Sequence, residues 1–290
     1  MTDKFLMEII RQDASDFIPR TFKRGSFEGP VEKYNKVSIC TNCMNRTSDL
    51  KQTYITNLEE NMKYPHVDFV LLNYNSEDDM DEWVKKNLMK YIEKGVLNYY
   101  HTTEPKYYSM THSRNVTFKL GKGDIVNNVD ADHFTNPAHG YPEKYRHIKI
   151  DDCFAEYINV LANHQHKKAV FLKSKQKNRG RLGFYKKDFL WLGGYDEGLK
   201  GYGHDDYDLL NRALCAGFTC LFFTGDYFSH TIDHRRHPTG NYKNKDWRYT
   251  QRLNTLISLL NLKYGKFQTN QDVHWGKAKL LKNWTEEIDI

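Results

Sequence analysis

Short apolar stretches that alternate with helix-like segments constrain the fold of this chain more than any other feature of its sequence. Four stretches have the length and apolar content of buried strands: Lys36–Thr41, Val67–Leu72, Val96–His101 and Ile125–Val129. The segments expected to be helical lie between them, at residues 47–62, 80–94 and 111–120. This order favours a right-handed, mostly parallel α/β sheet flanked by helices.

Two aspartates, Asp130 and Asp132, leave the end of the fourth predicted strand. Open α/β sheets place their ligands at strand ends, and paired carboxylates suit Mg²⁺ or Mn²⁺, which in turn would hold phosphate oxygens. The chain has two other Asp-x-Asp pairs, Asp79/Asp81 and Asp206/Asp208, so the apolar strand before Asp130 is what distinguishes this pair. The alternative is a solvated turn at a strand end.

Composition allows a sugar- or nucleotide-handling protein without requiring one. The 290 residues include 20 Tyr and 5 Trp, which suit stacking on sugars or bases, or else a tyrosine-rich core. The net charge of +6 fits anionic substrates such as nucleotides, or weak attraction to an anionic surface. Because no long basic run is present, we expect no nucleic-acid partner.

Features of the sequence that report on the compartment favour the cytoplasm. The first residues lack the apolar core and cleavage site of a signal peptide, and no apolar run is long enough to span a bilayer. Five cysteines, an odd number, fit a reducing compartment. Cys40 and Cys43 raise a redox or zinc alternative, but no second Cys-x-x-Cys follows, so both are interpreted as core residues.

Polar residues follow the other predicted strands as well. An Arg-bearing turn after the first strand is a suitable place for a nucleotide, and the 111–120 segment delivers Arg114 and Asn115 to the same face. Arg46 is equally compatible with a surface position. The residues expected to bind a nucleotide are Thr41, Asn42, Arg46, Asn73, Asn75, Arg114, Asn115, Asp130, Ala131 and Asp132.

Three motifs carry a family resemblance. These are His-Ser-Arg-Asn at 112–115, Asp-Ala-Asp at 130–132, and GGYDEGLKGYGHDDYDLLNR at 193–212. The last is similar to a GGFDE…GWGGED-x-DLxxR block and is the most specific. Residues from about 36 to 236 resemble inverting glycosyltransferases of the GT-A fold, of the family 2 and family 7 type, such as chondroitin polymerase domains and β-1,4-galactosyltransferases.

The resemblance implies roles for the acidic residues. Asp132 would contact the metal, and Asp130 the donor ribose or the metal through water. Asp206 would be the general base that takes the proton of the acceptor hydroxyl, and Asp205 would bind acceptor hydroxyls. The residues expected to contact the acceptor substrate are Tyr202, where the family has a Trp platform, Gly203, His204 and Asp205.

A third metal ligand is expected after the predicted strand at 219–223. Three histidines, His230, His234 and His237, follow it. His230 has the better distance from the strand, whereas His234-x-x-His237-Pro resembles a related family ending. The predicted ligands of Mn²⁺ or Mg²⁺ are therefore Asp132, His230 and Asp130, with His234 as the alternative to His230.

The chain departs from the family pattern at three places. His204 replaces a Gly, Asp205 replaces a Glu, and Asn73-Tyr-Asn-Ser replaces Asp-Asp-Gly-Ser after the second strand, which leaves the nucleotide identity open. The predicted function is metal-dependent, inverting transfer of a sugar from a nucleotide donor, expected to be a UDP-sugar, to a glycan or glycolipid hydroxyl, as in polysaccharide biosynthesis. The alternatives are a retaining enzyme resembling the GalNAc-transferases and a non-catalytic nucleotide-sugar-binding module.

The predicted organisation is an N-terminal extension at 1–35, a GT-A domain at 36–240 and a C-terminal helical segment at 241–290 packed on that domain. The extension is expected to open with a helix near Phe5–Arg11. Residues 152–161 fit a helix or an edge strand, 170–172 a strand, and 207–216 a helix ended by Gly217.

The C-terminal segment is expected to form two helices, at 247–264 and 275–284. The first would pack inward through Leu253, Leu256, Ile257, Leu260 and Leu262; the alternative is a membrane-surface or partner-docking helix carrying Lys277, Lys279 and Lys282.

Overall fold

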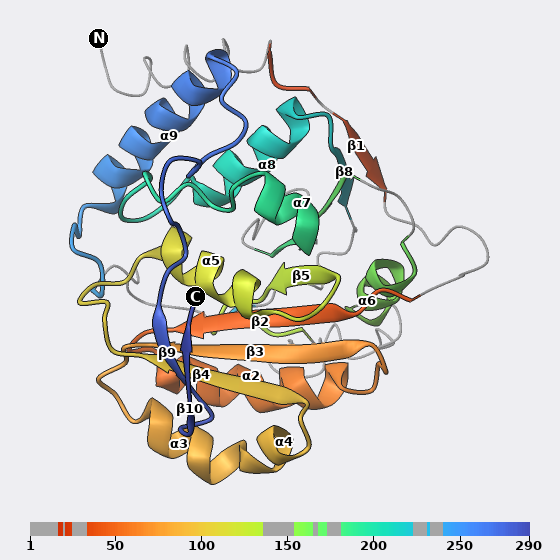
Figure 1. The fold of residues 1–290 in the computed structure, drawn as a ribbon, viewed down its shortest axis with the longest axis vertical. Coiled ribbons are helices and arrows are strands. Elements are labelled where there is room, and N and C mark those ends of the chain that lie inside the picture. Colours follow the sequence, from red (N-terminus) through yellow and green to blue (C-terminus); the bar gives the residue numbers. More distant parts are fainter. Residues whose placement is uncertain are drawn as a thin grey trace.

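The computed structural model describes residues 17–19, 21–24, 34–135, 154–164, 168–172, 181–222, 231–232 and 240–290. Within these residues one sheet has the strand order β1-β8-β6-β7-β5-β2-β3-β4-β9-β10 (Figure 1). Its strands are β1 (Phe22–Arg24), β2 (Val37–Cys43), β3 (Val67–Tyr74), β4 (Leu97–Thr102), β5 (Ile125–Asn128), β6 (Ala169–Leu172), β7 (Leu182–Tyr185), β8 (Thr219–Phe222), β9 (Lys279–Lys282) and β10 (Glu286–Asp289). The helices are α2 (Thr47–Asn61), α3 (Met80–Asn87), α4 (Met89–Glu93), α5 (Met110–Leu120), α6 (Phe154–Asn163), α7 (Lys186–Trp191), α8 (Asp205–Cys215) and α9 (Trp247–Lys263).

The central part of the sheet is parallel. Strands β5, β2, β3 and β4 pair side by side in parallel, whereas β7 and the β9–β10 hairpin run antiparallel. The side chains of β2 are buried throughout and those of β3 almost throughout, as expected where helices cover both faces of a parallel sheet. The predicted mostly parallel α/β sheet is confirmed.

The strand order reverses once within this parallel core. The chain lays β2, β3 and β4 side by side in one direction and then returns to place β5 on the other side of β2. In open α/β sheets ligands bind beyond the carboxyl ends of the strands that flank such a reversal. The fold itself therefore favours a ligand site where β2 and β5 end, at the residues around Arg46 and Asp130.

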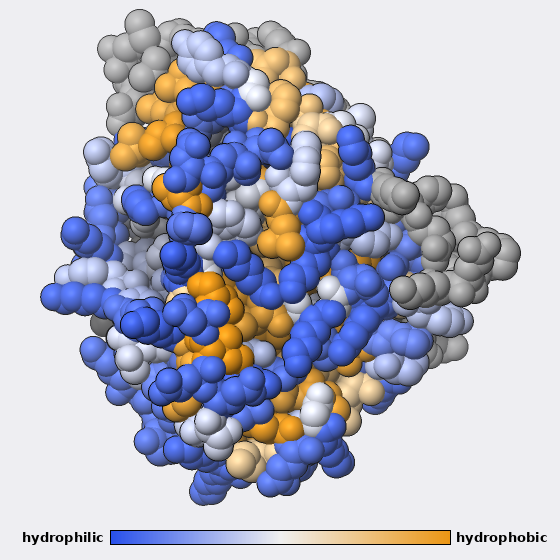
Figure 2. All heavy atoms as spheres, in the orientation of Figure 1, coloured by the Kyte–Doolittle hydropathy of each residue, from blue (hydrophilic) through white to orange (hydrophobic). Residues whose placement is uncertain are grey.

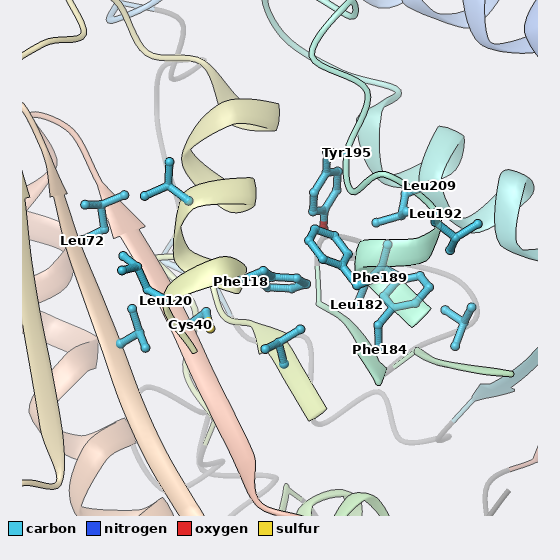
Figure 3. Packing of buried hydrophobic residues seen from close by; sticks show 14 of the residues in the cluster. Cys40, Leu72, Phe118, Leu120, Leu182, Phe184, Phe189, Leu192, Tyr195 and Leu209 are labelled. Atoms are coloured by element: carbon cyan, nitrogen blue, oxygen red, sulfur yellow. The ribbon is translucent and has the colours of Figure 1, made fainter. Parts of the chain in front are cut away.

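Two hydrophobic clusters lie on the two faces of the sheet. Phe69 and Leu71 of β3 join a cluster with α2, α3 and α6, and Leu72 joins one with α5, α7 and α8. Figure 3 shows the second cluster, in which Phe118 of α5 lies between the sheet and Phe189, with ring centroids 4.8 Å apart. The alternation of side chains along each strand thus supplies both cores.

Cys40 and Cys43 belong to these cores. Cys40 packs in the cluster with α5 and Cys43 in the cluster with α2, on opposite faces of β2. Burial raises the pKa of the Cys43 thiol to about 12. Two thiols that point to opposite faces of a strand cannot hold one metal ion, so the interpretation as core residues is confirmed.

Helix boundaries follow the predictions closely, with local differences. The expected 80–94 helix is divided at Leu88 into α3 and α4, and residues 152–161 lie largely in helix α6. The first helical N–H group of α2, that of Thr47, donates to Asp78 at 2.9 Å, so a carboxylate from the loop after β3 caps this helix. Gly217 follows α8 with φ 85°, as expected for a C′ glycine. The helix expected near Phe5–Arg11 lies outside the described residues.

The C-terminal segment differs from the prediction. Helix α9 forms as expected, but Leu253 and Leu260 are exposed while Leu262 is buried, so the predicted inward face is partly wrong. The helix predicted at 275–284 is wrong, and with it the basic docking helix, because Lys279 and Lys282 bound strand β9.

Two local features explain this hairpin. Strand β9 pairs with the open edge of β4, and Asn283 and Trp284, both with positive φ, turn the chain into β10. Trp284 then packs on Tyr99 with ring centroids 4.8 Å apart.

In the described part of the chain, every helix is too short or too polar to cross a bilayer.

The turn between α7 and α8 is bound on two sides. The Arg212 guanidinium of α8 donates to the carbonyl oxygens of Gly194 at 2.7 Å and Leu192 at 3.0 Å. From the C-terminal segment, Asn270 donates to the carbonyl of Gly193 at 2.7 Å. Gly193 has φ 77°, and a Cβ added there would lie 1.9 Å from the Thr269 carbonyl oxygen. Backbone conformation and space both require glycine at this position.

We predict that Gly193→Ala lowers the free energy of unfolding by about 3 kcal/mol or more, because it adds a backbone clash to left-handed strain. Gly217→Ala is the matched control, since Gly217 has φ 85° and nothing within 4 Å of an added Cβ. The control is expected to lose only about 1 kcal/mol. Urea unfolding of both variants measures the difference, and equal losses would contradict the structure.

Candidate active site

Four aspartates gather beyond the carboxyl ends of β2 and β5. Asp130 and Asp132 follow β5, and Asp205 and Asp206 open helix α8. Arg114 of α5 joins the two pairs: its Nη1 donates to Asp205 at 2.6 Å and Asp206 at 2.7 Å, and its Nη2 to Asp130 at 3.0 Å. The structure therefore brings together the two acidic motifs that the sequence separates widely.

The Arg114 guanidinium is almost fully enclosed. Its side chain is 3% exposed, and the Tyr195 ring lies under it with the centroid 5.5 Å from Cζ. Burial disfavours the charge of Arg114, but the neighbouring carboxylates, Asp206 first, outweigh it and raise the pKa of this guanidinium. Arg114 is thus a fixed positive charge at the centre of the site.

The carboxylates around Arg114 titrate differently. Burial would raise the pKa of Asp130, but the charge of Arg114 prevails and holds it well below its usual range. Burial raises the pKa of Asp206 to about 8, with added repulsion from Asp205 and Asp130, although Arg114 opposes the shift. The pKa of Asp205 is also raised, by burial first. The Asp206 side chain is 17% exposed and that of Asp205 5%, so Asp206 is the carboxylate more open to a substrate.

Arg46 fixes the second residue of the Asp-x-Asp pair. It precedes α2 directly after β2, and its guanidinium donates to Asp49 at 2.7 Å and to Asp132 at 3.1 Å. The charges of Asp132 and Asp49 raise the pKa of Arg46 despite its partial burial. The predicted Arg46 is therefore a site residue and not an isolated surface arginine.

His133 is a site residue that the sequence reasoning missed. Its Nδ1 accepts a hydrogen bond from Arg181 Nε at 2.7 Å, so in the neutral ring the proton is on Nε2. Nε2 lies 3.8 Å from Asp132 Oδ1, and Nδ1 lies 3.7 Å from Asp130 Oδ2. No pattern in the local sequence distinguishes His133 from a structural histidine, because its partner Arg181 comes from a distant segment.

The acidic pair provides donors that fit a divalent cation. Asp130 and Asp132 offer hard carboxylate oxygens, and four site aspartates face two guanidinium groups, Arg46 and Arg114. Groups of three metal-binding side chains are absent among the described residues. Both His230 and His234 lie outside that part of the chain.

The chain next to His230 nevertheless passes beside the acidic pair. Thr231 forms a β-bridge with His133, and the amide of Ile232 donates to the carbonyl oxygen of Asp132 at 3.0 Å. Residues 231–232 therefore lie beside the Asp-x-Asp pair, and coordination by His230 stays a prediction.

The other predicted nucleotide-binding residues mostly order the loops. Thr41 donates to the carbonyl of Val129 at 2.8 Å, and Asn42 accepts from Ser113 at 3.1 Å, and both residues are buried. The Ala131 carbonyl accepts from Thr53 at 2.6 Å. These contacts hold the ends of β2 and β5 together, so a role in binding a nucleotide stays a prediction for them.

The asparagines after β3 and in α5 bind neighbouring loops. Asn73 accepts from the Ser76 amide at 2.8 Å, and Asn75, with φ 57°, donates to the Pro105 carbonyl at 2.8 Å. Asn115 is fully buried, and its amide group donates to the Tyr195 carbonyl and to Glu197, both at 2.9 Å. Asn115 thus positions the segment that leads to Asp205, which is the contact the geometry supports for it.

The predicted acceptor residues form a loop held by α9. The Tyr202 ring meets the Tyr242 ring edge to face, with centroids 6.0 Å apart. The Gly203 carbonyl accepts from Asn254 of α9 at 2.9 Å. His204 has φ 71°, a left-handed backbone that glycine adopts more readily than histidine, and its ring stacks on Tyr207 with centroids 5.6 Å apart.

Comparison with known proteins agrees with this geometry. A family model described as the N-terminal domain of galactosyltransferase matches residues 167–237, which include the whole 193–212 motif. The fold is similar to that of mannosyltransferase PcManGT from Pyrobaculum calidifontis in complex with GDP-Man and Mn²⁺. The TM-score is 0.56 at 15% identity, over 89% of this chain and 71% of that one. A search of curated protein sequences gave no significant match.

Two further structures share the fold. For S. aureus TarS 1-349 in complex with UDP-GlcNAc, the TM-score is 0.54 at 17% identity, over 78% of this chain and 67% of that one. For GalNAc-T7 with UDP, GalNAc and Mn²⁺, it is 0.51 at 12% identity, over 92% and 58%. The predicted GT-A fold is confirmed, and the family match supports the predicted glycosyltransferase.

The raised pKa of Asp206 predicts how stability depends on pH in metal-free buffer. The folded protein keeps a proton on Asp206 up to about pH 8, whereas the unfolded chain releases it near the ordinary aspartate pKa of 3.8. The contribution of Asp206 to the free energy of unfolding therefore falls as pH rises through that window. Asp206→Asn removes this loss, so the variant should gain about 1–3 kcal/mol relative to wild type between about pH 5 and about pH 8.

Asp289→Asn, at an exposed position on β10, serves as the control and should follow the wild-type pH profile. Urea unfolding at both pH values in the presence of a chelator gives the comparison. Parallel profiles for wild type and Asp206→Asn would show that ionisation of Asp206 does not lower the free energy of unfolding.

Proposed function

We propose that this chain is a metal-dependent inverting glycosyltransferase, which moves a sugar from a nucleotide donor, a UDP-sugar, to a hydroxyl of a glycan or glycolipid. The observation that carries the proposal is the contact of one buried arginine with both acidic motifs. Inverting transfer needs one carboxylate set at the donor diphosphate and a second at the acceptor hydroxyl. The Arg114 guanidinium forms hydrogen bonds with both carboxylate sets, so it holds the two sets close together.

On the acceptor side, Asp206 is the general base. It takes the proton of the acceptor hydroxyl while that oxygen attacks the sugar C1 and the bond from C1 to the diphosphate breaks. A base works best with a pKa near the working pH, and burial brings the pKa of Asp206 to about 8. Asp205, behind it, is proposed to bind acceptor hydroxyls, and Tyr202 to stack on the sugar.

On the donor side, Asp132, Asp130 and His230 are the residues that would hold the cation. The bound cation would neutralise charge that develops on the departing diphosphate. Arg46 orients Asp132 through the 3.1 Å hydrogen bond. His230 is proposed over His234 because Thr231, its neighbour in the chain, pairs with His133 beside Asp132.

The similar structures support parts of this proposal. PcManGT and GalNAc-T7 were solved with Mn²⁺, and TarS and GalNAc-T7 with UDP-containing or UDP ligands. The nucleotide of PcManGT is GDP-linked, so a UDP donor is the part of the proposal with the narrower support. The likeness to GalNAc-T7 also keeps a retaining reaction as the second candidate.

The first test is metal dependence of donor hydrolysis, because slow hydrolysis requires no known acceptor. Across a panel of nucleotide sugars, hydrolysis of the preferred donor should vanish with EDTA and return with Mn²⁺ or Mg²⁺. His230→Ala should raise the Mn²⁺ concentration for half activity more than its control His234→Ala, by about tenfold or more. Full activity in excess EDTA would exclude the metal role, and the reverse order of the two variants would assign the ligand to His234.

The second test separates binding from chemistry. Asp206→Asn keeps the size of the side chain but removes the proton acceptor, so transfer should fall by about 10²–10⁴ while donor binding stays within a few-fold. Asp205→Asn, the matched control in the same pair, should act mainly through the acceptor KM. NMR of the product should show the anomeric configuration opposite to that of the donor. Normal turnover of Asp206→Asn, or a product that retains the donor configuration, would favour the retaining candidate.

A further inference from the structure

Helix α9 buries a mixed face against the protein. Besides Leu259 and Leu262, the residues it buries are small and polar: Thr250, Asn254, Thr255 and Ser258. Two of them hold the loop at residues 202–204, the acceptor loop, since Thr250 donates to the Tyr202 carbonyl at 3.0 Å and Asn254 to the Gly203 carbonyl at 2.9 Å. A helix on the surface of a globular protein ordinarily turns its apolar residues inward, whereas α9 leaves several of them facing outward.

The outward side of α9 and the residue after it carry an apolar stripe. Tyr249 is 55% exposed, Leu253 40%, Leu260 53% and Tyr264 77%. Their spacing of four, seven and four residues places them along one side of the helix, over a length of roughly 22 Å. Figure 2 shows hydrophobic side chains over α9 interleaved with hydrophilic ones. We call these four residues the α9 stripe.

Basic residues border the α9 stripe. Between residues 247 and 267 the sequence contains no Asp or Glu, and the basic residues Arg248, Arg252, Lys263 and Lys266 are all exposed. By helical position Arg252 and Lys263 lie beside the stripe, and Arg248 lies further round the helix. An apolar line with amphipathic Tyr rings at its ends and cations along one edge matches the layers of an anionic membrane surface.

We propose that α9 docks this protein on an anionic lipid bilayer, with the α9 stripe in the headgroup region and the basic edge on the lipid phosphates. A bilayer is favoured over a protein partner because the face is a single narrow line with one sign of charge, without the surrounding patch that a stable protein interface needs. The acceptor loop lies on the other side of the same helix, about 10 Å away. On the proposed function, which this last step requires, the acceptor is a lipid-linked glycan.

The test is co-sedimentation of the full chain with vesicles of phosphatidylglycerol and phosphatidylcholine, compared with phosphatidylcholine alone. Wild type should bind the anionic vesicles, with affinity falling as salt rises. The double variant Leu253→Gln/Leu260→Gln should bind at least about tenfold more weakly, and Arg252→Gln/Lys263→Gln should lose the preference for anionic lipid. The matched control is Met89→Gln on α4, an apolar residue 39% exposed at the opposite end of the molecule from α9, which should bind as wild type does (Figure 1).

Each other outcome overturns the proposal. Wild type that stays in the supernatant, or a Leu253→Gln/Leu260→Gln variant that binds as wild type does, excludes membrane docking through the α9 stripe. A lower melting temperature of that variant without vesicles would show that the stripe packs against this chain itself. A wild-type dimer that the variant abolishes would assign the stripe to a second copy. Because vesicle binding is measured without turnover, its failure is separate from failure of the proposed reaction.

Discussion

The contact of Arg114 with three carboxylates is the interaction on which the candidate site depends. Asp130 comes from the end of β5 and Asp205 and Asp206 from the start of α8, and nothing else described in the structure joins these two elements at the site so directly. Without the guanidinium, three buried like charges would face one another at a cost of about 3–5 kcal/mol or more. Helix α5 must therefore hold Arg114 rigidly, and it does so through Val116 and Phe118 in the core and through Asn115, which binds the segment before α8. The geometry of the site therefore depends on the packing of α5.

Many residues of the 193–212 motif hold the site in place and have no proposed part in the reaction. Arg212 is buried and binds Asp208 and the carbonyl of Gly194, and Glu197 accepts from Asn115 and from the amide of Gly276. These residues fold the turn that presents Asp205 and Asp206. A motif can be specific to a family because the residues that fold its backbone are constrained as strongly as the residues that react.

The sequence could predict the features that depend on residues close together in the chain. Strand and helix order follows from apolar stretches and their spacing, so the α/β sheet was within reach, as were Asp130 and Asp132 at a strand end. The hairpin at 279–289 was not, because β9 forms on an edge of β4 nearly 180 residues earlier in the chain, as the pairing of His101 with Leu281 shows. His133 and the central role of Arg114 were missed for the same reason, since their partners lie far away in the sequence. For α9 the helical period was read correctly but its inward face only in part. Leu262 packs inward as predicted, whereas hydrogen bonds to the acceptor loop, which do not depend on hydropathy, place Thr250 and Asn254 on the inward face as well.

The charges of the site explain why its acidic residues differ so much in proton affinity. Among the described residues, the carboxylates of Asp130, Asp132, Asp205 and Asp206 lie around two guanidinium groups, and one of these, Arg46, also binds Asp49. Burial first, and then repulsion from Asp205 and Asp130, raises the pKa of Asp206 to about 8, whereas Arg114 holds the pKa of Asp130 well below its usual range. On the proposed function, a divalent cation at Asp130 and Asp132 would add positive charge beside these carboxylates. It would lower the pKa of Asp206 and favour the ionised carboxylate that accepts a proton, so the proposed metal site and the proposed base would be coupled electrostatically.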